Sequence, residues 1–558
     1  MTSRRKLVLL LFAVSAASAA GCNDLSGSLL KERGAGEGED PALDSLGERL
    51  VAGPAMTRNL SNREYLNAVS DLIGERLPLD LQKTWTATTQ FSGFDAVPWS
   101  NLDTKAVRDL SETLEAILDR SVTSPKVMRC SVTTAEQLPY DACARSIVES
   151  FASRAYGRPL APAESESLAK RYADGIALAD GALDDPKEIF LDGLRSALGS
   201  VLLAPQFVTR IEVPPAADFA GERELNAYEL ASRLSFMFTA SIPDDELWSK
   251  AEDDSLTRPE VLRAQVDRLL DTKTDLFVQT FMGQWFDFRA WEGTAPDTLE
   301  HAMWNESWRT LADVVKEDLP VTAIVEPGFT YVNRDLAAHY NLVGEFGAEL
   351  TRVPTAERGG VLQQGSWLSL SATPLKTSPI HRGRLVQDRL LCKVIPPPDS
   401  ALFEQIQKVT ESIPANASVK ERLESHRNAG EACAGCHTYM DPIGLGLEGF
   451  DMHGRLRNAY ADTGRPVETE SNLLGRPFSR FSELNTMVAN LPDYHRCAAE
   501  KLTVYSVRRV VDARSPEDAD LLAYLTHPID GRPPSLRAMI TRLVASKTFR
   551  NVKHGGAK

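Results

Sequence analysis

The chain has 558 residues, of which 43% are hydrophobic and 25% are charged. This composition is ordinary for globular proteins, and it excludes a mainly disordered chain, a collagen-like chain and a membrane protein with several spanning helices. The formal net charge is -15, which argues against a nucleic-acid partner because such binding depends on clustered lysine and arginine side chains.

The N-terminus has the layout of a secretory signal peptide. Three basic residues at 4–6 precede an apolar run over 7–14, and small residues follow. The sequence Ser-Ala-Ala-Gly-Cys at 18–22 resembles a bacterial lipobox, in which the cysteine becomes the lipidated N-terminus. We therefore expect residues 1–22 to be a lipoprotein signal peptide and Cys22 to carry the lipid. Secretion by ordinary signal-peptide cleavage is the alternative.

This signal predicts where the protein resides. It should be exported and anchored to a membrane by lipid, in the periplasm or at the outer membrane. No later segment reaches the roughly 18 to 20 uninterrupted apolar residues that a membrane helix needs. Residues 23–54 mix glycine, serine and acidic residues, and such a composition cannot bury enough apolar surface to fold. We expect this stretch to be a disordered tether.

The body that follows is predicted to be helical. Ser61 and Glu64 have the spacing of a capping box, and apolar residues recur at helical spacing from there to Gly74. Further amphipathic helices are expected over 144–156, 225–238, 258–270, 308–319 and 379–391, and another helix is expected to begin at Pro243. In the 379–391 helix, Ser378 should be the N-cap. Strand-like alternation is scarce.

The expected fold class is mostly α, a multi-domain helical protein with a small cytochrome c-like unit toward the C-terminus. The proline run at 396–398 and the polar stretch to about 430 have the composition of a connector. We expect five domains in the body. They are a helical N-terminal domain (55–125), a helical domain with a local disulfide (126–200), a helical domain (201–345), a domain carrying the haem motif (346–460) and a helical C-terminal domain (461–558).

The strongest chemical signal is Cys-Ala-Gly-Cys-His at 433–437. Two thiols with this spacing, Cys433 and Cys436, can each form a thioether with a vinyl group of haem, and the adjacent His437 can bind the iron. We therefore expect one covalent haem c per chain. A disulfide within the motif and a zinc site on the same side chains are the alternatives, although zinc needs a fourth ligand that the sequence does not offer nearby.

The second iron ligand is less clear from the sequence. Met440 lies only three residues after His437, on the same side of the haem, and should be a packing residue. Met487 lies 50 residues downstream, as in the methionine loop of small cytochromes c, and is the favoured iron ligand. His495, His453 and a vacant or water-occupied position are the alternatives.

Four cysteines remain, and they allow three pairings. Cys130 and Cys143 are close in sequence, so a local disulfide between them is the simplest arrangement. Cys392 is then left to pair with Cys497, and both bonds suit an oxidising compartment. Buried free thiols are the alternative.

Two groups of charged residues have structural interpretations. Glu229 and Arg233 stand at i and i+4 in an expected helix and should form an ion pair. His381, Arg382 and Arg384, beside the N-cap at Ser378, could hold a haem propionate, or they could belong to a solvated helix end.

The chain resembles a set of uncharacterised secreted proteins of planctomycetes and myxobacteria. These are built from consecutive domains of unknown function numbered fifteen-eighty-seven, fifteen-ninety-five, fifteen-ninety-two, fifteen-eighty-eight and fifteen-eighty-five. The stretches that carry the resemblance are 60–65, 154–160, 228–235, 243–247, 358–362, 377–383 and 436–444. Members are often described as planctomycete-type cytochrome c proteins, so the resemblance implies haem binding, but it implies no catalytic residue or substrate.

Two functions remain open. The first is an exported lipoprotein that uses haem c for electron transfer or a haem-based oxidation, together with a redox or envelope protein partner. Whether it is an enzyme, such as a haem-dependent oxidoreductase, stays open. The second is a non-enzymatic envelope binding protein in which Cys-x-x-Cys-His is structural or binds another metal. The helical bulk exceeds what an electron carrier needs, so it should bind a further ligand that the sequence does not identify.

Overall fold

The computed structural model describes residues 40–555, apart from 56, 83–84, 86, 89, 92, 96, 99–103, 132–133, 141, 180–182, 217, 356–357, 373–375 and 397–399. The predicted signal peptide and Cys22 therefore lie outside the described residues. The chain divides into two compact units, Met1–Arg49 and Leu50–Lys558. The domain boundaries expected at 125, 200, 345 and 460 all fall inside the second unit, and that finer division stays a prediction.

The disordered tether expected over 23–54 is wrong at its C-terminal end. Residues Pro41–Glu48 form helix α2, whose N-cap Asp40 accepts hydrogen bonds from the amides of Ala42 and Leu43. Strand β1 (Gly53–Pro54) follows in the second unit. An aspartate N-cap followed by proline is a strong local helix signal, and it outweighs the glycine-rich and acidic composition of the preceding residues.

The next segment contains the first predicted helix. Ser61 Oγ accepts from the amide of Glu64 at 3.1 Å, and the amide of Ser61 donates to Glu64 Oε2 at 2.9 Å, so the capping box is present. The helices are α3 (Asn62–Ile73), α4 (Thr104–Thr123), α5 (Ala142–Tyr156), α6 (Pro162–Ala179), α7 (Pro186–Leu202) and α8 (Pro205–Val208). The strands are β2 (Thr57–Asn59), β3 (Gln90–Phe91), β4 (Phe94–Asp95), β5 (Val97–Pro98) and β6 (Thr209–Ile211).

In the middle segment the predicted helices are present with shifted boundaries. Asp244 is the N-cap of α10, so this helix begins after Pro243 rather than at it. The helix expected over 308–319 is α14, which begins at Leu299 because Thr298 caps it through the amide of His301. The elements are β7 (Gly221–Glu224), α9 (Ala227–Thr239), α10 (Asp245–Glu252), α11 (Pro259–Thr272), α12 (Thr274–Phe277), α13 (Gly283–Trp285), α14 (Leu299–Lys316), β8 (Phe329–Val332), α15 (Arg334–His339) and β9 (Thr351–Pro354).

The connector expected from 396 to about 430 contains two helices. Ser418 and Glu421 form a capping box at the start of the second, and this is the same local signal that marked Ser61. Composition alone was therefore a poor guide here. The helices of this segment are α16 (Gly365–Leu370), α17 (Pro379–Arg389), α18 (Ser400–Ser412), α19 (Val419–Arg427) and α20 (Glu431–Gly446).

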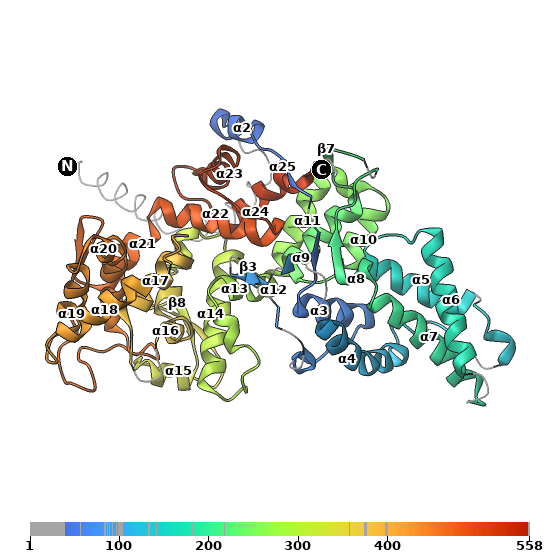
Figure 1. The fold of residues 1–558 in the computed structure, drawn as a ribbon, viewed down its shortest axis with the longest axis horizontal. Helices are drawn as coiled ribbons and strands as arrows, with labels where there is room; N and C mark the ends of the chain where they lie inside the picture. Colours follow the sequence, from blue (N-terminus) through green and yellow to red (C-terminus); the bar gives the residue numbers. More distant parts are fainter. Residues whose placement is uncertain are drawn as a thin grey trace, which may run out of the picture. The chain divides into compact units, whose positions relative to one another are not determined.

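The C-terminal segment closes the second unit. Its elements are β10 (Ser471–Leu473), β11 (Arg476–Phe478), α21 (Phe481–Ala489), α22 (Pro492–Val507), α23 (Pro516–Thr526), α24 (Leu536–Ala545), α25 (Lys547–Arg550) and β12 (Asn551–His554). Val552 pairs in parallel with Gly53 of β1 and antiparallel with Arg223 of β7. The mostly α fold class is confirmed. In Figure 1, α18, α19 and α20 lie together at one end of the second unit, and α5, α6 and α7 lie at the other.

Two disulfides tie this unit together. Cys130 is joined to Cys143, and Cys392 is joined to Cys497 at a sequence separation of 105. The second bond fixes the chain just after α17 to the middle of α22. Across the part of the chain that the structure describes, no helix combines the length and apolar character needed to cross a bilayer.

Candidate functional site

The Cys-x-x-Cys-His motif lies in α20. Cys433, Cys436 and His437 occupy positions i, i+3 and i+4, which share one face of a helix. Cys433 is buried, Cys436 is half-buried, and both thiols are free. The structure therefore presents two thiols and an imidazole as one stripe, and the thiols are not joined in a disulfide.

A buried carboxylate orients the imidazole. Nδ1 of His437 lies 2.8 Å from Oδ1 of Asp441, one turn further along α20, and both side chains are buried. Since the carboxylate accepts, Nδ1 carries the proton, and in the neutral imidazole Nε2 is the nitrogen with the free lone pair. A histidine that donates through one ring nitrogen to a carboxylate is the usual arrangement for a metal-binding imidazole. His437 is thus prepared to act as a ligand through Nε2.

A second histidine, which the sequence interpretation missed, faces the first. The rings of His426 on α19 and His437 have centroids 6.0 Å apart and planes inclined by 10°. Burial lowers the pKa of His426, and neighbouring His437 lowers it further, so the neutral form that binds metals is favoured. Nε2 of His426 lies 3.4 Å from Oγ1 of exposed Thr410, which is a long contact for a hydrogen bond.

The favoured second ligand, Met487, and the alternatives His495 and His453 lie in other contacts. Met487 of α21 packs partly buried against the main core, and α21 meets α20 near Gly446, about 13 Å along the axis from His437. Nε2 of His495 lies 2.9 Å from the carbonyl oxygen of Ala489. The ring of His453 lies edge to face against the ring of His339, with centroids 6.5 Å apart. Met487 as an iron ligand stays a prediction.

Arg382 does not belong to a solvated helix end, and it is not available to a haem propionate. It is fully buried, and Nη1 donates to the carbonyl oxygens of Leu447 and Phe450, each at 2.7 Å. Nη1 also lies 3.3 Å from Glu448 Oε1, and Nη2 donates to the carbonyl of Asp451 at 2.7 Å. Arg382 therefore fixes the turn that follows α20.

The ion pair expected between Glu229 and Arg233 is wrong. Glu229 instead binds Arg223 through two bonds of 2.7 Å. Arg233 binds Glu212 at 2.6 Å. Both partners come from outside α9, so helical spacing could not identify them.

Three segments of the chain match families described as proteins of unknown function. Residues 143–212 match the family DUF1595, residues 225–342 match DUF1592, and residues 358–460 match DUF1588. The chain carries three consecutive domains of unknown function. The Cys-x-x-Cys-His stripe lies within the DUF1588 segment. No curated protein and no solved structure matches the chain.

No group of three or more histidine, cysteine, aspartate or glutamate side chains within the described ranges is arranged to hold a metal ion. Haem c does not require such a group, because its two cysteines bond to the vinyl carbons of the macrocycle and leave the iron to the axial ligands.

Proposed function

We propose that this protein is an exported lipoprotein that holds one covalent haem c on Cys433, Cys436 and His437 and transfers electrons at the cell envelope. One observation carries the proposal. The four other described cysteines are joined in disulfides, as suits an oxidising compartment, whereas the two motif thiols are free and share a helix face with an oriented histidine. In an oxidising compartment, two neighbouring thiols escape disulfide formation when they are bonded to another group, such as haem.

Each residue of the motif has a distinct part. Cys433 and Cys436 would form the thioethers, Nε2 of His437 would bind iron, and Asp441 would hold the ring and increase its basicity. When bound, haem supplies a one-electron couple whose potential follows its axial ligands, hydrogen bonding and burial. A redox protein of the envelope must then deliver or accept the electron.

His426, whose ring lies beside that of His437, would be a second group able to bind the iron. Its lowered pKa favours the neutral form that binds metals. The observed centroid separation is 6.0 Å, with ring planes 10° from parallel. The contact of Thr410 with His426 would give way on binding, because it is long and exposed.

The haem proposal is tested by expressing the full chain with haem-maturation machinery. The purified protein should give a reduced pyridine haemochrome spectrum of haem c, keep its colour through acid-acetone extraction, and gain the mass of one haem. Cys436→Ala should weaken or abolish covalent attachment, while His437→Ala should keep the thioethers and lose the axial ligand. A folded but colourless protein would favour the envelope binding protein.

The distal ligand is tested by spectroscopy on the same protein. His426→Ala should convert a low-spin ferric spectrum into a high-spin one and let carbon monoxide bind the ferrous haem. Met487→Ala is the matched comparison and should leave the spectrum unchanged. If Met487→Ala, and not His426→Ala, abolishes a sulfur-to-iron charge-transfer band, the distal role passes to Met487.

The anchor is a separate part of the proposal. Cys22→Ala should release the protein from membranes, and globomycin should cause the precursor to accumulate. Unchanged membrane association in both tests would exclude lipidation at Cys22.

A further inference from the structure

A cavity of about 600 Å³ lies within the second unit, remote from the haem motif in the chain. Its wall combines residues from β2, the end of α5, β6, α9 and the end of α22. Five arginines line it, namely Arg58, Arg158, Arg210, Arg233 and Arg508. Two glutamates, Glu212 and Glu229, line it as well. The cavity is therefore rich in positive charge although the whole chain is acidic.

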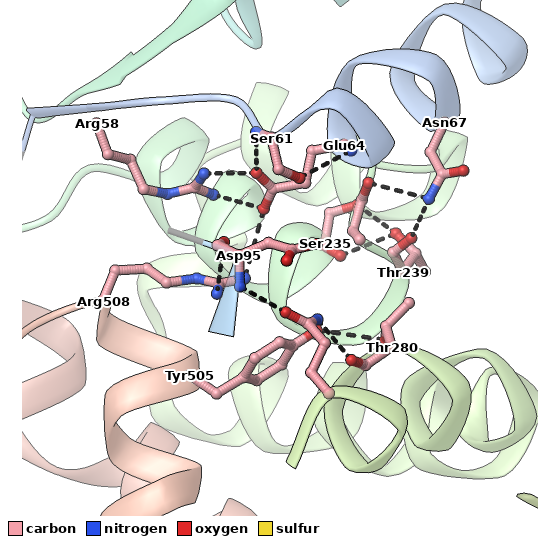
Figure 2. Close-up of polar contacts among 12 residues, drawn as sticks. Arg58, Ser61, Glu64, Asn67, Asp95, Ser235, Thr239, Thr280, Tyr505 and Arg508 are labelled. Atoms are coloured by element: carbon pink, nitrogen blue, oxygen red, sulfur yellow. Dashed lines mark hydrogen bonds and ion pairs between the residues drawn. The ribbon is translucent and has the colours of Figure 1, made fainter. Parts of the chain in front are cut away.

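Four of these five arginines have carboxylate partners. Arg158 binds Glu164 at 2.8 and 2.9 Å, and Arg233 binds Glu212. Figure 2 shows Arg58 and Arg508 approaching Glu64 from two different segments, at 2.7 and 3.4 Å.

Glu64 is itself buried. Although burial raises the pKa of Glu64, Arg58 and Arg508 hold it below its ordinary value. Glu64 is therefore ionised, and its charge is already shared between two guanidinium groups.

Arg210 is the exception. Its Nε and Nη2 are buried and have no hydrogen-bond partner among the residues that the structure describes. Arg210 lies opposite Arg58 in the β2–β6 pair, and both guanidinium groups stack on the ring of Phe236, at 4.3 and 5.6 Å. Burial, followed by the charge of Arg58, lowers the pKa of Arg210 to about 9, although the charge of Glu64 opposes the shift. The side chain is still cationic at neutral pH.

A buried guanidinium without a hydrogen-bonded counter-charge is strongly unfavourable. Arg63 and Arg289 each have one buried, unbonded nitrogen and bind Glu292 and Asp95 through another nitrogen. Arg210 has two such nitrogens. Nε and Nη2 form one edge of the guanidinium fork. That edge matches two oxygens of a carboxylate or a phosphate.

We propose that this cavity binds an organic anion whose carboxylate or phosphate oxygens pair with the guanidinium group of Arg210. The rings of Tyr156, Tyr228 and Phe236 line the same cavity and offer apolar surface to the body of the ligand. The volume lies in the usual range of small-molecule sites. This site uses no residue of α20, so it does not depend on the haem proposal.

The test measures the thermal unfolding midpoint of the full chain in acetate, benzoate and inorganic phosphate, with chloride as the reference at constant ionic strength. At least one oxyanion should raise the midpoint of the wild type in a saturable way. A benzoate or acetate response identifies a carboxylate, and a phosphate response identifies a phosphate ester. Arg210→Met should abolish the response, and without oxyanion it should unfold at a higher temperature than the wild type.

Two further variants sharpen the result. Arg210→Lys keeps the charge but loses the fork, and it should bind at least about ten-fold more weakly. Arg334→Met removes an exposed arginine of α15 and should leave the response unchanged. Equal responses in wild type and Arg210→Met, or no Arg210-dependent response to any of the three anions, would overturn the proposal.

Discussion

Gly383 on α17 faces the main-chain carbonyl of Met440 on α20 so closely that a β-carbon at position 383 would overlap it. Gly444, one turn further along α20, meets the carbonyl of Pro379 in the same way. The two helices therefore cross with their backbones in contact. The helix that carries the thiols is seated on α17 at two points where no side chain fits.

The first expectation concerns this crossing. Gly383→Ala should reduce the free energy of unfolding by about 1–3 kcal/mol, because neither backbone can yield without moving its helix. Gly435→Ala is the matched control in α20, since a β-carbon there meets nothing within 4 Å. That control should be neutral or more stable by up to about 1 kcal/mol, because alanine has the higher helix propensity. Urea unfolding of both variants measures the difference, and equal losses would contradict the backbone contact.

The second expectation concerns the fully buried Arg382. Arg382→Met should reduce the free energy of unfolding by about 3–5 kcal/mol, because it removes the Arg382 donor from three carbonyl groups and one of the two arginines that contact Glu448. Glu448 still pairs with Arg457 at 2.8 Å. Because its charge stays partly compensated, we expect the loss in the free energy of unfolding to be about 3 kcal/mol. In a double-mutant cycle, the combination with Glu448→Leu should restore part of the loss. Simple addition of the two single losses would show that these side chains act independently.

The third expectation compares the two disulfides. Replacing Cys392 and Cys497 by serine should lower the free energy of unfolding more than replacing Cys130 and Cys143, since the first bond closes 105 residues and the second 13. Chain-entropy arguments put both losses at about 2–5 kcal/mol. Denaturant unfolding of the two double variants under oxidising conditions measures them. The reverse ranking would mean that local strain or packing, rather than loop length, dominates.

The fourth expectation concerns pH. Burial raises the pKa of Glu306 to about 7, although Arg358 and the hydroxyl groups of Thr330 and Tyr340 oppose the rise. The native state therefore keeps this proton where the unfolded state has lost it. Below about pH 4.5 Glu306 makes its full contribution to the free energy of unfolding. This contribution is lost as pH rises through about 7, and the total loss is about 3 kcal/mol.

Glu306→Gln removes the titration and should flatten this part of the stability profile. Urea unfolding across the pH range, with the wild-type curve subtracted from the variant curve, isolates the contribution of the group. Parallel curves for the two proteins would show that Glu306 ionises at an ordinary pH.

Local signals in the sequence located many helices but not the contacts between them. The capping box of Ser61 and the N-cap of Ser378 each depend on residues within one turn, so spacing alone identified them. Residues 396–430 were interpreted from composition, and this concealed the helix that carries His426. The Ser418–Glu421 capping box was the signal that could have found it.

The charged cavity could not be predicted from the sequence. Arg58 and Arg210 become neighbours because β2 pairs with β6, and Arg508 joins them from the end of α22. No spacing rule connects these three positions. The spacing of Glu229 and Arg233 was misleading for the same reason. Although Arg233 stands at i+4 in the same helix, Glu229 binds Arg223, which belongs to strand β7.

The pairing of β12 between β1 and β7 bears on how the chain is made. The hydroxyl of Thr548 donates to the carbonyl of Val51, 497 positions earlier. Residues 53–54 are synthesised long before residues 551–554, so β1 has no β12 partner during that interval. The thiols of α20 also emerge before β12 does. A chain interrupted before residue 551 would leave β1 and β7 without this partner, and unpaired strand edges favour aggregation.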